Sequence, residues 1–359
     1  MTVFFNEHRV KLLGSGSTLP GPAIDNQALD VLLKNTMGER TARKAQKISQ
    51  YFGITSRHWA RGSQHATVNN SNIGLEIGIE SINKALLSAN RSHKNNEIET
   101  LDYLIGHTTS PHTLLPPNIA WIADALGHEG PYMEFRQACC GFANALQTAA
   151  ALLSSQTELN SVGILGSEVG SLYVDFTQSF LDQEQLINCM QMGDGAGSVI
   201  LGKDDGSHSQ IISDIYLGHI GNGKQPGFGI SGGGASHIRC ENDFPHFFHH
   251  AKDVKAQGAE LFKNGLTAML DRGYKITDFD FILPHQVNGH LAKMFADELG
   301  FDPNKIIVDA DKLGNLGSAA IWVSLDKLRR SNILKPGHKV LVLGAEATKY
   351  IYGGFVYHH

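Results

Sequence analysis

Residues 161–170 read SVGILGSEVG, and residues 339–348 read KVLVLGAEAT. Each stretch begins as an apolar run typical of a buried strand and continues into Leu-Gly, a small residue and Glu. Each half of the chain contains this unit once. Two copies separated by about half the chain length predict two duplicated α/β halves rather than a solenoid of short repeats. Chance similarity between two buried strands is the alternative.

Strand-like and helix-like stretches alternate along the rest of the sequence, a pattern typical of an α/β fold. Strands are predicted at residues 10–16, 101–106, 132–136, 161–166, 279–283, 305–308 and 339–343. Helices are predicted at residues 73–88, 118–126, 141–153, 251–272, 289–299 and 318–329. Residues 202–209 have the Gly-, Asp-, Ser- and His-rich composition of a linker. We therefore predict an N-terminal half at residues 1–204 and a C-terminal half at residues 205–359.

The composition indicates a folded protein that does not bind nucleic acid. The chain has 359 residues, of which 42% are hydrophobic and 18% charged, enough to build a large core. Its formal charge of −5, from 30 basic and 35 acidic residues, gives no net attraction for a polyphosphate. The sequence has no signal-peptide pattern at its start and no apolar run of membrane-spanning length. We therefore expect a soluble, cytoplasmic protein.

Two adjacent cysteines stand where a short predicted strand turns into a helix. They are Cys139 and Cys140, in RQACCGFANAL at residues 136–146. At a helix start, free N–H groups and the positive end of the helix dipole favour a thiolate, the reactive form of cysteine. Burial as a small apolar side chain is the alternative for each residue. With only Cys189 and Cys240 besides, the chain has too few cysteines for a disulfide framework, so thiols are expected.

A histidine and an asparagine follow in similar surroundings. His285 stands in ILPHQVN, residues 282–288, at the end of an apolar strand, where open α/β sheets place their ligands. Asn315 stands in KLGNLGSAA, residues 312–320, between glycines and just before a helix. The alternative for His285 is a structural hydrogen bond, and the alternative for Asn315 is a role in forming the turn. Together with a cysteine at a helix start, however, they form a much less common combination that favours a catalytic site.

At these residues the sequence resembles the thiolase-fold condensing enzymes, most closely the ketoacyl-ACP synthase III branch. The resemblance runs nearly end to end, and the ordered set ACxGF, PHQxN and GN makes it specific. The matching motifs are GSGSTLP at 14–20, GITSRH at 53–58, ACCGF at 138–142, GSEVG at 166–170, MGDGAGSVIL at 192–201, PHQVN at 284–288, GNLGSAA at 314–320 and LKPGHKVLVLG at 334–344. GDGAG alone could be a phosphate loop, but no Lys-Ser/Thr follows, so a tight turn into a strand is favoured. The resemblance implies two thiolase-like halves in an α-β-α-β-α arrangement.

The resemblance also implies roles for particular residues. Cys139 would accept the acyl group as a thioester, and Cys140 would be a small neighbour. His285 and Asn315 would hold the carbonyl of a second thioester and donate to its oxygen as that oxygen becomes negative. The further candidates for substrate contact are Phe142, Met192, His290 and Lys349.

In family members, a loop of the dimer partner reaches over the acyl tunnel. The corresponding loop here is residues 106–117, and Leu114 or Leu115 would be the tunnel residue of a homodimer. Packing within a solvated loop is the alternative.

The implied activity is a β-ketoacyl synthase III-like decarboxylative Claisen condensation, in fatty-acid-like or polyketide-like biosynthesis. The substrates would be acyl thioesters of an acyl carrier protein or coenzyme A, with a malonyl- or β-ketoacyl-type thioester as second substrate and no cofactor. Two alternatives stay open. One is an acyltransferase that moves the acyl group from Cys139 to an amine or alcohol, with His285 as general base. The other is a non-catalytic partner subunit of a heteromeric ketosynthase.

The sequence departs from the family pattern at the tunnel mouth. Family members that use coenzyme A carry arginines there, because Lys or Arg usually meets a phosphate or an acidic carrier. The matching places here are residues 50–52, an uncharged stretch near Leu186, and His290. A carrier protein docking elsewhere, through Arg57, Lys252 or Lys255, is a further possibility.

A second departure concerns the C-terminal loop. Ala347, Thr348 and Lys349 stand where the family has a glycine triplet that lines the oxyanion hole, and only Gly353 and Gly354 follow. Both departures favour a specialised relative of the fatty-acid initiator.

Residues 240–250, CENDFPHFFHH, offer a thiol and three imidazoles. Their spacing is not a recognised zinc pattern, and the interleaved phenylalanines suggest a loop over the tunnel entrance. We therefore expect no metal.

Overall fold

The computed structural model describes residues 1–5, 8–60, 72–92, 100–174, 176, 182–232, 234 and 247–359. Its strands are β1 (Thr2–Phe4), β2 (Val10–Thr18), β3 (Ile24–Asp25), β4 (Ser56–Arg57), β5 (Tyr103–His107), β6 (Tyr132–Phe135), β7 (Ser161–Glu168), β8 (Gly195–Lys203), β9 (Ile211–His219), β10 (Phe228–Ile230), β11 (Phe247–His249), β12 (Phe281–Pro284), β13 (Lys339–Glu346) and β14 (Ile351–His358). Its α-helices are α1 (Asn26–Met37), α2 (Glu39–Phe52), α3 (Ile73–Ser92), α4 (Asn118–Ala125), α5 (Gly141–Ser155), α6 (Gln183–Gln191), α7 (Ala251–Asp271), α8 (Leu291–Leu299), α9 (Ala310–Leu313) and α10 (Ala320–Arg330). The 3₁₀ helices are η1 (Gly170–Tyr173), η2 (Ile276–Asp278), η3 (Pro303–Lys305) and η4 (Gly317–Ala319).

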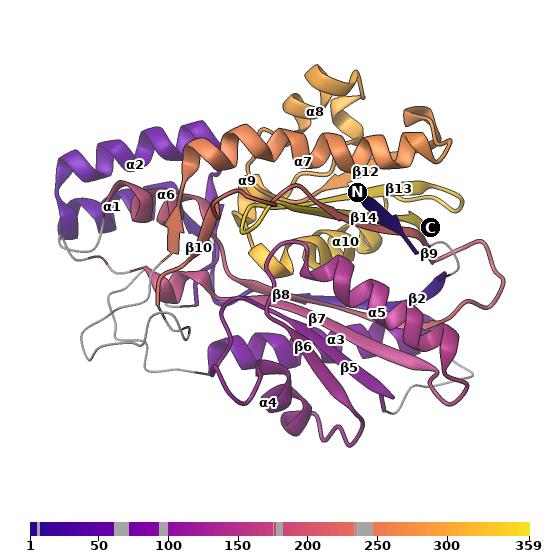
Figure 1. Cartoon of the computed structure of the whole chain (residues 1–359). Helices are drawn as coiled ribbons and strands as arrows, with labels where there is room; N and C mark the ends of the chain where they lie inside the picture. Colours follow the sequence, from indigo (N-terminus) through magenta and orange to yellow (C-terminus); the bar gives the residue numbers. More distant parts are fainter. Residues whose placement is uncertain are drawn as a thin grey trace.

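The main sheet has the strand order β12-β13-β14-β9-β2-β8-β7-β5-β6, and β1 pairs with β9 (Figure 1). Strands from residues 10–203 form one end of this order, and strands from residues 211–358 form the other. The two ends meet where β2 pairs with β9 at Val10↔Ile212 and Lys11↔Ile211. The division of the chain at residues 204 and 205 itself stays a prediction.

The two repeated sequence units occupy equivalent positions in the sheet. β7 pairs in parallel with β5 and antiparallel with β8. β13 likewise pairs in parallel with β12 and antiparallel with β14. Both strands are buried almost throughout, as their continuous apolar sequences predict.

Helices pack between the two ends of the strand order and on their outer faces. α5 contacts β5 and β7 at one end and β9 and β14 at the other, and α10 contacts β2, β8 and β12. On the outer faces, α3 packs on β2, β7 and β8, whereas α7 packs on β13 and β14. The layers follow the predicted α-β-α-β-α order, and the central core includes Phe142 and Leu146 of α5 with Ile321 and Trp322 of α10.

Most of the predicted elements are confirmed within a few residues, including the strand after GDGAG, which is β8. The strand predicted at residues 305–308 is wrong. Asp302 and Pro303 start a 3₁₀ helix there, because the Asp302 side chain accepts the N–H of Asn304 at 2.9 Å. Within the described chain, these residues form only an isolated bridge, Ile282↔Ile306.

Across the described ranges, none of the helices combines the length and the apolar character needed to cross a bilayer.

Candidate active site

Cys139 and Cys140 lie in a turn between β6 and α5, residues 138–141, which we call the nucleophile turn after the role predicted for Cys139. The N–H of Gly141 donates to the carbonyl oxygen of Ala138 at 2.9 Å, which closes the turn. Cys139 is partly exposed, whereas Cys140 is fully buried and donates its thiol hydrogen to the carbonyl oxygen of Ile351 at 3.5 Å. Of the two thiols, Cys139 is therefore the more accessible to a substrate.

The start of α5 does not favour a thiolate at Cys139, contrary to the expectation from the sequence. The N–H of Cys140 donates to Oε2 of Glu346 at 2.8 Å. Burial raises the pKa of Cys139 well above its ordinary value, and the charges of Glu346 and Glu168 raise this pKa further. Oε2 of Glu346 thus accepts the N–H at the helix start that could otherwise stabilise a thiolate, and the raised pKa favours the thiol form of Cys139.

Glu168 and Glu346 are the glutamates of the two repeated sequence units, and both are buried at the ends of their strands. Glu168 accepts four hydrogen bonds, from the side chains of residues 109 and 110 and from the N–H and hydroxyl of Ser318. Among the described residues, Glu346 accepts only two, from the nucleophile turn and from the Thr348 hydroxyl. The sequence marks these glutamates as repeat positions but does not reveal that they flank the nucleophile turn.

His285 follows β12, and its ring is buried without a partner. The N–H of His285 donates to the carbonyl oxygen of Leu343 in β13 at 2.7 Å, which anchors the residue to the neighbouring strand. Neither Nδ1 nor Nε2 has a hydrogen-bond partner within the described part of the chain, although the residue is only 1% exposed. Burial lowers the pKa of His285 to about 3. The ring is therefore neutral and carries one unused N–H donor.

Gln286 fixes the loop that carries His285. Its Nε2 donates to the carbonyl oxygens of Pro284 at 2.8 Å and Ile307 at 3.0 Å. Its Oε1 accepts from two N–H groups at the start of α9, at 2.7 and 3.1 Å. The glutamine of PHQVN therefore uses both ends of its amide for structure, a role that the motif alone does not reveal.

Asn315 lies between α9 and η4, and its side chain has a fixed orientation. Its Oδ1 accepts the N–H of Gly317 at 3.0 Å, so the Nδ2 donor points away from that bond and has no partner among the residues described. The N–H of Asn315 donates to the carbonyl oxygen of Gln191 at 2.8 Å, and Nε2 of Gln191 donates to the carbonyl oxygen of Val287 at 2.9 Å. Gln191 therefore links the loop of Asn315 to the loop of His285.

Ser318 links the loop of Asn315 to the nucleophile turn. Its hydroxyl lies 3.2 Å from the carbonyl oxygen of Gln137 and donates to Oε2 of Glu168 at 2.8 Å. The segments that carry Cys139, His285 and Asn315 are thus tied together by hydrogen bonds. Direct convergence of the three side chains stays a prediction.

Two of the other candidate residues are buried. Phe142 packs in the core against Trp322 and Phe355, with ring centroids 5.8 and 6.0 Å apart. Met192 is buried and forms an isolated bridge with Asn315. The contact of either residue with a substrate stays a prediction.

Four candidates lie at the surface. Leu114 and Leu115 are 66% and 85% exposed, as a loop that reaches toward another molecule requires. His290 is exposed, with Nε2 3.2 Å from the carbonyl oxygen of Gln50 at the end of α2. Lys349 is exposed in the turn at residues 347–350. Their contacts with a substrate also stay predictions.

The prediction that Arg57 helps to dock a carrier protein is wrong. It is fully buried and donates to Oδ1 of Asn26 at 2.8 Å and to the carbonyl oxygen of Met190 at 2.9 Å. Burial lowers the pKa of Arg57 to about 10. The other two residues proposed for docking, Lys252 and Lys255, are exposed on α7.

Residues 240–246 of the histidine-rich segment lie outside the described residues. His249 has Nδ1 3.3 Å from Oδ1 of Asn188, and His250 has Nδ1 3.0 Å from the carbonyl oxygen of Pro226. The part of the chain that the structure describes contains no cluster of three or more potential metal ligands.

Comparison with known proteins agrees with this architecture. The family model "3-Oxoacyl-[acyl-carrier-protein (ACP)] synthase III" matches residues 133–218, and the model of its C-terminal part matches residues 269–357. The first region contains Cys139, and the second contains His285 and Asn315.

Curated relatives cover nearly the whole chain. A beta-ketoacyl-[acyl-carrier-protein] synthase III of Clostridium acetobutylicum is 25% identical over 351 residues, which are 93% of this chain and 94% of the relative. The protein of the same name from Wolbachia pipientis wMel is 26% identical, over 94% of this chain and 95% of the relative.

Solved structures have the same fold. The 3-oxoacyl-(acyl carrier protein) synthase III of Pseudomonas aeruginosa PAO1 superimposes with a TM-score of 0.78 at 21% identity, over 97% of this chain and 98% of the other. AbyA1, described as a tetronic acid condensing enzyme, superimposes with a TM-score of 0.79 at 23% identity, over 98% of this chain and 100% of the other.

Proposed function

From the premise that the chain is a thiolase-fold protein of the ketoacyl-ACP synthase III type, we propose that it catalyses a decarboxylative Claisen condensation. The two matched models and the end-to-end relatives confirm that type, which the motifs predicted. In the proposed reaction, an acyl group held on Cys139 is joined to a malonyl-type thioester, whose free carboxylate leaves as carbon dioxide. The product is a β-ketoacyl thioester, so the protein is an acyl-transferring enzyme.

The observation that supports this reaction best is the state of His285. A buried polar group without a partner is costly, and most such groups in proteins are paired. His285 has two unpaired ring nitrogens and a pKa lowered to about 3. A neutral ring with a spare N–H suits donation to a carbonyl oxygen that gains negative charge in the reaction.

The first half of the reaction loads the acyl group. The sulfur of Cys139 forms a bond to the thioester carbonyl carbon, and the bond from that carbon to the carrier sulfur breaks. The carrier leaves as a thiol with the proton that Cys139 gives up.

The second half forms the carbon–carbon bond. The bond between the carboxylate and the α-carbon of the malonyl thioester breaks, and carbon dioxide leaves. The electron pair moves onto the thioester oxygen, which accepts hydrogen bonds from the His285 ring and from Nδ2 of Asn315. The α-carbon then attacks the acyl group on Cys139, and the sulfur is released and regains a proton.

The acyltransferase alternative asks His285 to act as a general base toward an amine or alcohol. A base works best when its pKa lies near the working pH. The pKa of His285, at about 3, makes the ring a poor base before substrate enters. This argues for the condensation over heteroatom transfer.

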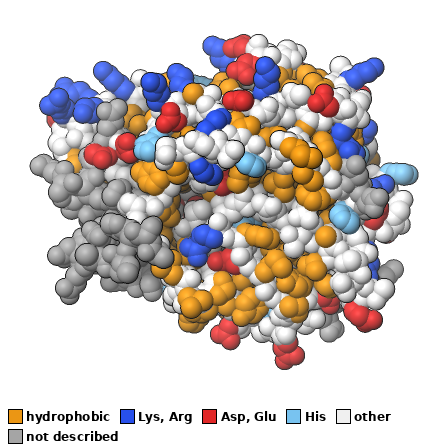
Figure 2. All heavy atoms as spheres, in the orientation of Figure 1, with side chains coloured by type: hydrophobic (Ala, Val, Ile, Leu, Met, Phe, Trp, Pro, Cys, Tyr) orange, Lys and Arg blue, Asp and Glu red, His pale blue; other side chains and the backbone are white. Residues whose placement is uncertain are grey.

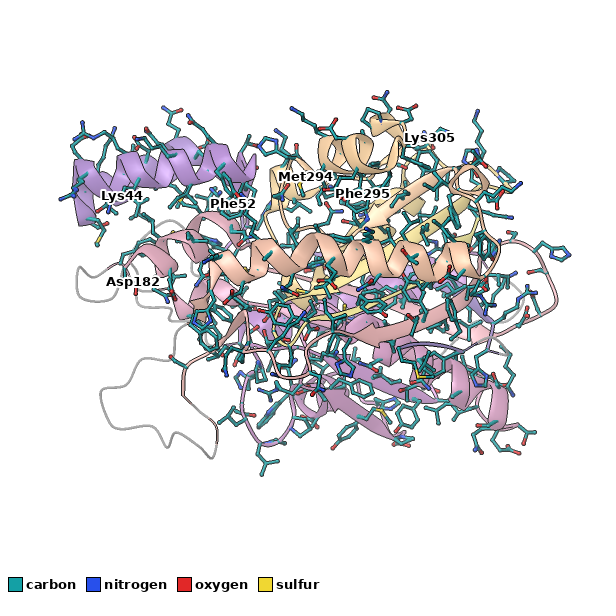
Figure 3. All side chains as sticks on the ribbon, turned by 45° about the horizontal axis from the view of Figure 1, so that its top comes forward. Lys44, Phe52, Asp182, Met294, Phe295 and Lys305 are labelled. Carbon is teal, nitrogen blue, oxygen red and sulfur yellow. The ribbon has the colours of Figure 1, made fainter. Side chains whose placement is uncertain are left out.

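The acyl donor is proposed to be a thioester of an acidic carrier protein. Figure 2 shows Lys and Arg side chains gathered over α1 and α2. The exposed basic residues of α2 are Arg40, Arg43, Lys44 and Lys47. Figure 3 shows α2 running from Lys44 to Phe52, with Phe52 toward Met294 of α8. That end of α2 adjoins the segment after His285, because the N–H of Gly289 donates to the carbonyl oxygen of Phe52 at 2.7 Å.

The setting of the reaction is proposed from the same resemblance. We place the enzyme in the cytoplasm, as a homodimer in which Leu114 or Leu115 of one subunit covers the tunnel of the other. The absence of arginines at residues 50–52 and the residues Ala347, Thr348 and Lys349 support a specialised pathway, fatty-acid-like or polyketide-like, rather than housekeeping initiation.

The proposal is tested by incubating the protein with an acyl thioester and malonyl carrier protein labelled in its free carboxyl group. Intact mass should show an acyl adduct that Cys139→Ala abolishes and Cys140→Ala retains. Release of labelled carbon dioxide together with a β-ketoacyl product supports condensation. An acylated amine or alcohol without carbon dioxide release supports the acyltransferase instead, and no adduct at all supports the non-catalytic subunit.

A further inference from the structure

The buried carboxylate of Glu346 contacts the nucleophile turn across a large distance in sequence. Its Oε2 accepts the N–H of Cys140, 206 residues away, at 2.8 Å. The same turn is held a second time by the adjoining strand, because the Cys140 thiol donates to the carbonyl oxygen of Ile351. Glu346 and Ile351 are paired residues of β13 and β14. The end of this hairpin therefore determines where the turn lies.

Glu346 also brings a carboxyl group to the place where a thiolate would form. Burial raises the pKa of this carboxyl group, whereas the hydrogen bonds from the Thr348 hydroxyl and the Cys140 N–H favour its charged form. The start of a helix attracts an anion, because its first N–H groups have no partner within the helix. At the start of α5, the carboxylate of Glu346 already takes that place. A second anion on the adjacent residue, Cys139, would be repelled by the first.

The two repeat glutamates differ in how firmly their charges are held. Glu168 accepts four hydrogen bonds from neighbouring side chains and backbone. For Glu346, the described residues supply the Cys140 N–H and the Thr348 hydroxyl. The Glu346 carboxylate therefore depends on the nucleophile turn itself for half of its hydrogen bonds.

We propose that Glu346 is a positioning residue that holds the nucleophile turn through Cys140 and keeps Cys139 in its thiol form when no substrate is bound. The inference rests on the proposed function only in taking Cys139 as the nucleophile. A residue of the C-terminal half, Glu346, would therefore set the protonation state of a cysteine in the N-terminal half, Cys139. A thiol is less open to alkylation and oxidation than a thiolate, so the resting site is protected.

Other ionisable groups face this turn. They are Glu168 at the end of β7, the thiol of Cys140, Tyr216 of β9 beside Cys140, and the neutral ring of His107 against Gly141. The Cys140→Ala background of the test removes the Cys140 thiol, and the remaining groups are the same in every variant.

The test is the pH dependence of Cys139 alkylation by iodoacetamide, measured by intact mass in a Cys140→Ala background. Glu346→Gln keeps an oxygen that accepts the turn N–H but removes the charge. Its alkylation profile should move to lower pH by about one unit, which is about a tenfold faster reaction at a fixed pH below the midpoint.

Glu134→Gln is the matched control, since Glu134 accepts the N–H of Ile119 at the start of α4 at 2.8 Å in the same manner. Its profile should equal that of the parent. An unchanged or upward-shifted profile for Glu346→Gln would overturn the proposal. If Glu346→Gln does not fold, Glu346→Ala, which also removes the carboxyl group, decides: a downward shift supports the proposal and no shift overturns it.

The assay uses no thioester, so its outcome is separate from that of the proposed function. A shifted alkylation profile in a protein that never acquires an acyl group would refute the condensing enzyme and leave the role of Glu346 intact. Acyl loading of Cys139 together with an unshifted alkylation profile would support the condensing enzyme and refute the role of Glu346.

Discussion

Replacing His285 by phenylalanine is expected to stabilise the protein while it abolishes condensation. His285 is buried, and neither ring nitrogen has a hydrogen-bond partner among the described residues. A buried polar group left without a partner costs about 1–3 kcal/mol. An apolar ring of similar shape removes that cost, so His285→Phe should raise the free energy of unfolding at pH 7 by about 1–2 kcal/mol.

The gain should increase as the pH falls. The folded-state pKa of His285 is lowered from 6.5 to about 3, so below pH 6.5 the unfolded chain binds a proton that the folded chain does not. Stability from the neutral ring is therefore present above pH 6.5 and is lost as the pH falls toward 3. At pH 4.5 this loss is about 3 kcal/mol, and His285→Phe, which has no group to protonate, does not undergo it.

His107→Phe is the matched control. His107 is equally buried, and burial lowers its pKa to about 3 as well, but its Nε2 accepts the N–H of Trp322 at 3.0 Å. Its replacement leaves that N–H unpaired, so it should give no gain at pH 7 and yet show the same reduced sensitivity to acid.

Urea unfolding followed by tryptophan fluorescence at pH 7 and pH 4.5 measures both effects, with His285→Leu as a second variant in case phenylalanine is too large. Acyl loading of Cys139 should persist in both His285 variants while release of carbon dioxide is lost. A loss of stability at pH 7 in both variants would refute the reasoning, because it would mean that the ring has a partner in the folded protein.

Three further outcomes follow from the same contacts. Asn315→Ala should slow carbon dioxide release by about a hundredfold and leave acyl loading nearly unchanged, as separate assays of the two steps will show. Ser318→Ala removes a bond to Glu168 and should lower the free energy of unfolding by about 1.5–3 kcal/mol in urea titrations. Arg57→Met removes the donor to the buried carbonyl oxygen of Met190 and to the partly buried Oδ1 of Asn26, so it should lower the free energy of unfolding by at least about 2 kcal/mol. The salt dependence of carrier-protein binding should stay as in the parent.

The sequence predicts those parts of the fold that depend on local pattern. The continuous apolar runs at residues 161–168 and 339–346 predict buried strands, and their shared ending predicts the equivalent positions that β7 and β13 take. The failure at residues 305–308 has a local cause too, because the preceding Asp-Pro pair starts a 3₁₀ helix before a strand can form.

The parts that could not be predicted depend on partners distant in sequence. Arg57 has the charge of a surface residue, but its hydrogen-bond partners lie 31 and 133 residues away and make it a buried one. The helix start at Cys139 favours a thiolate only where its N–H groups are free, and the N–H of Cys140 is already bound by the carboxyl group of residue 346. Motifs identified Cys139, His285 and Asn315 as candidates, whereas Glu346, Gln286 and Ser318 could be recognised only from three-dimensional contacts.

The most direct test of the proposed convergence uses Cys139→Gln, whose side chain imitates a loaded acyl group. The measurement is the release of labelled carbon dioxide from a malonyl thioester, with no acyl donor present. If the three groups share one site, this variant should release carbon dioxide without forming a condensed product, and adding His285→Phe should stop the release. A folded Cys139→Gln protein that leaves the malonyl thioester intact would contradict the account.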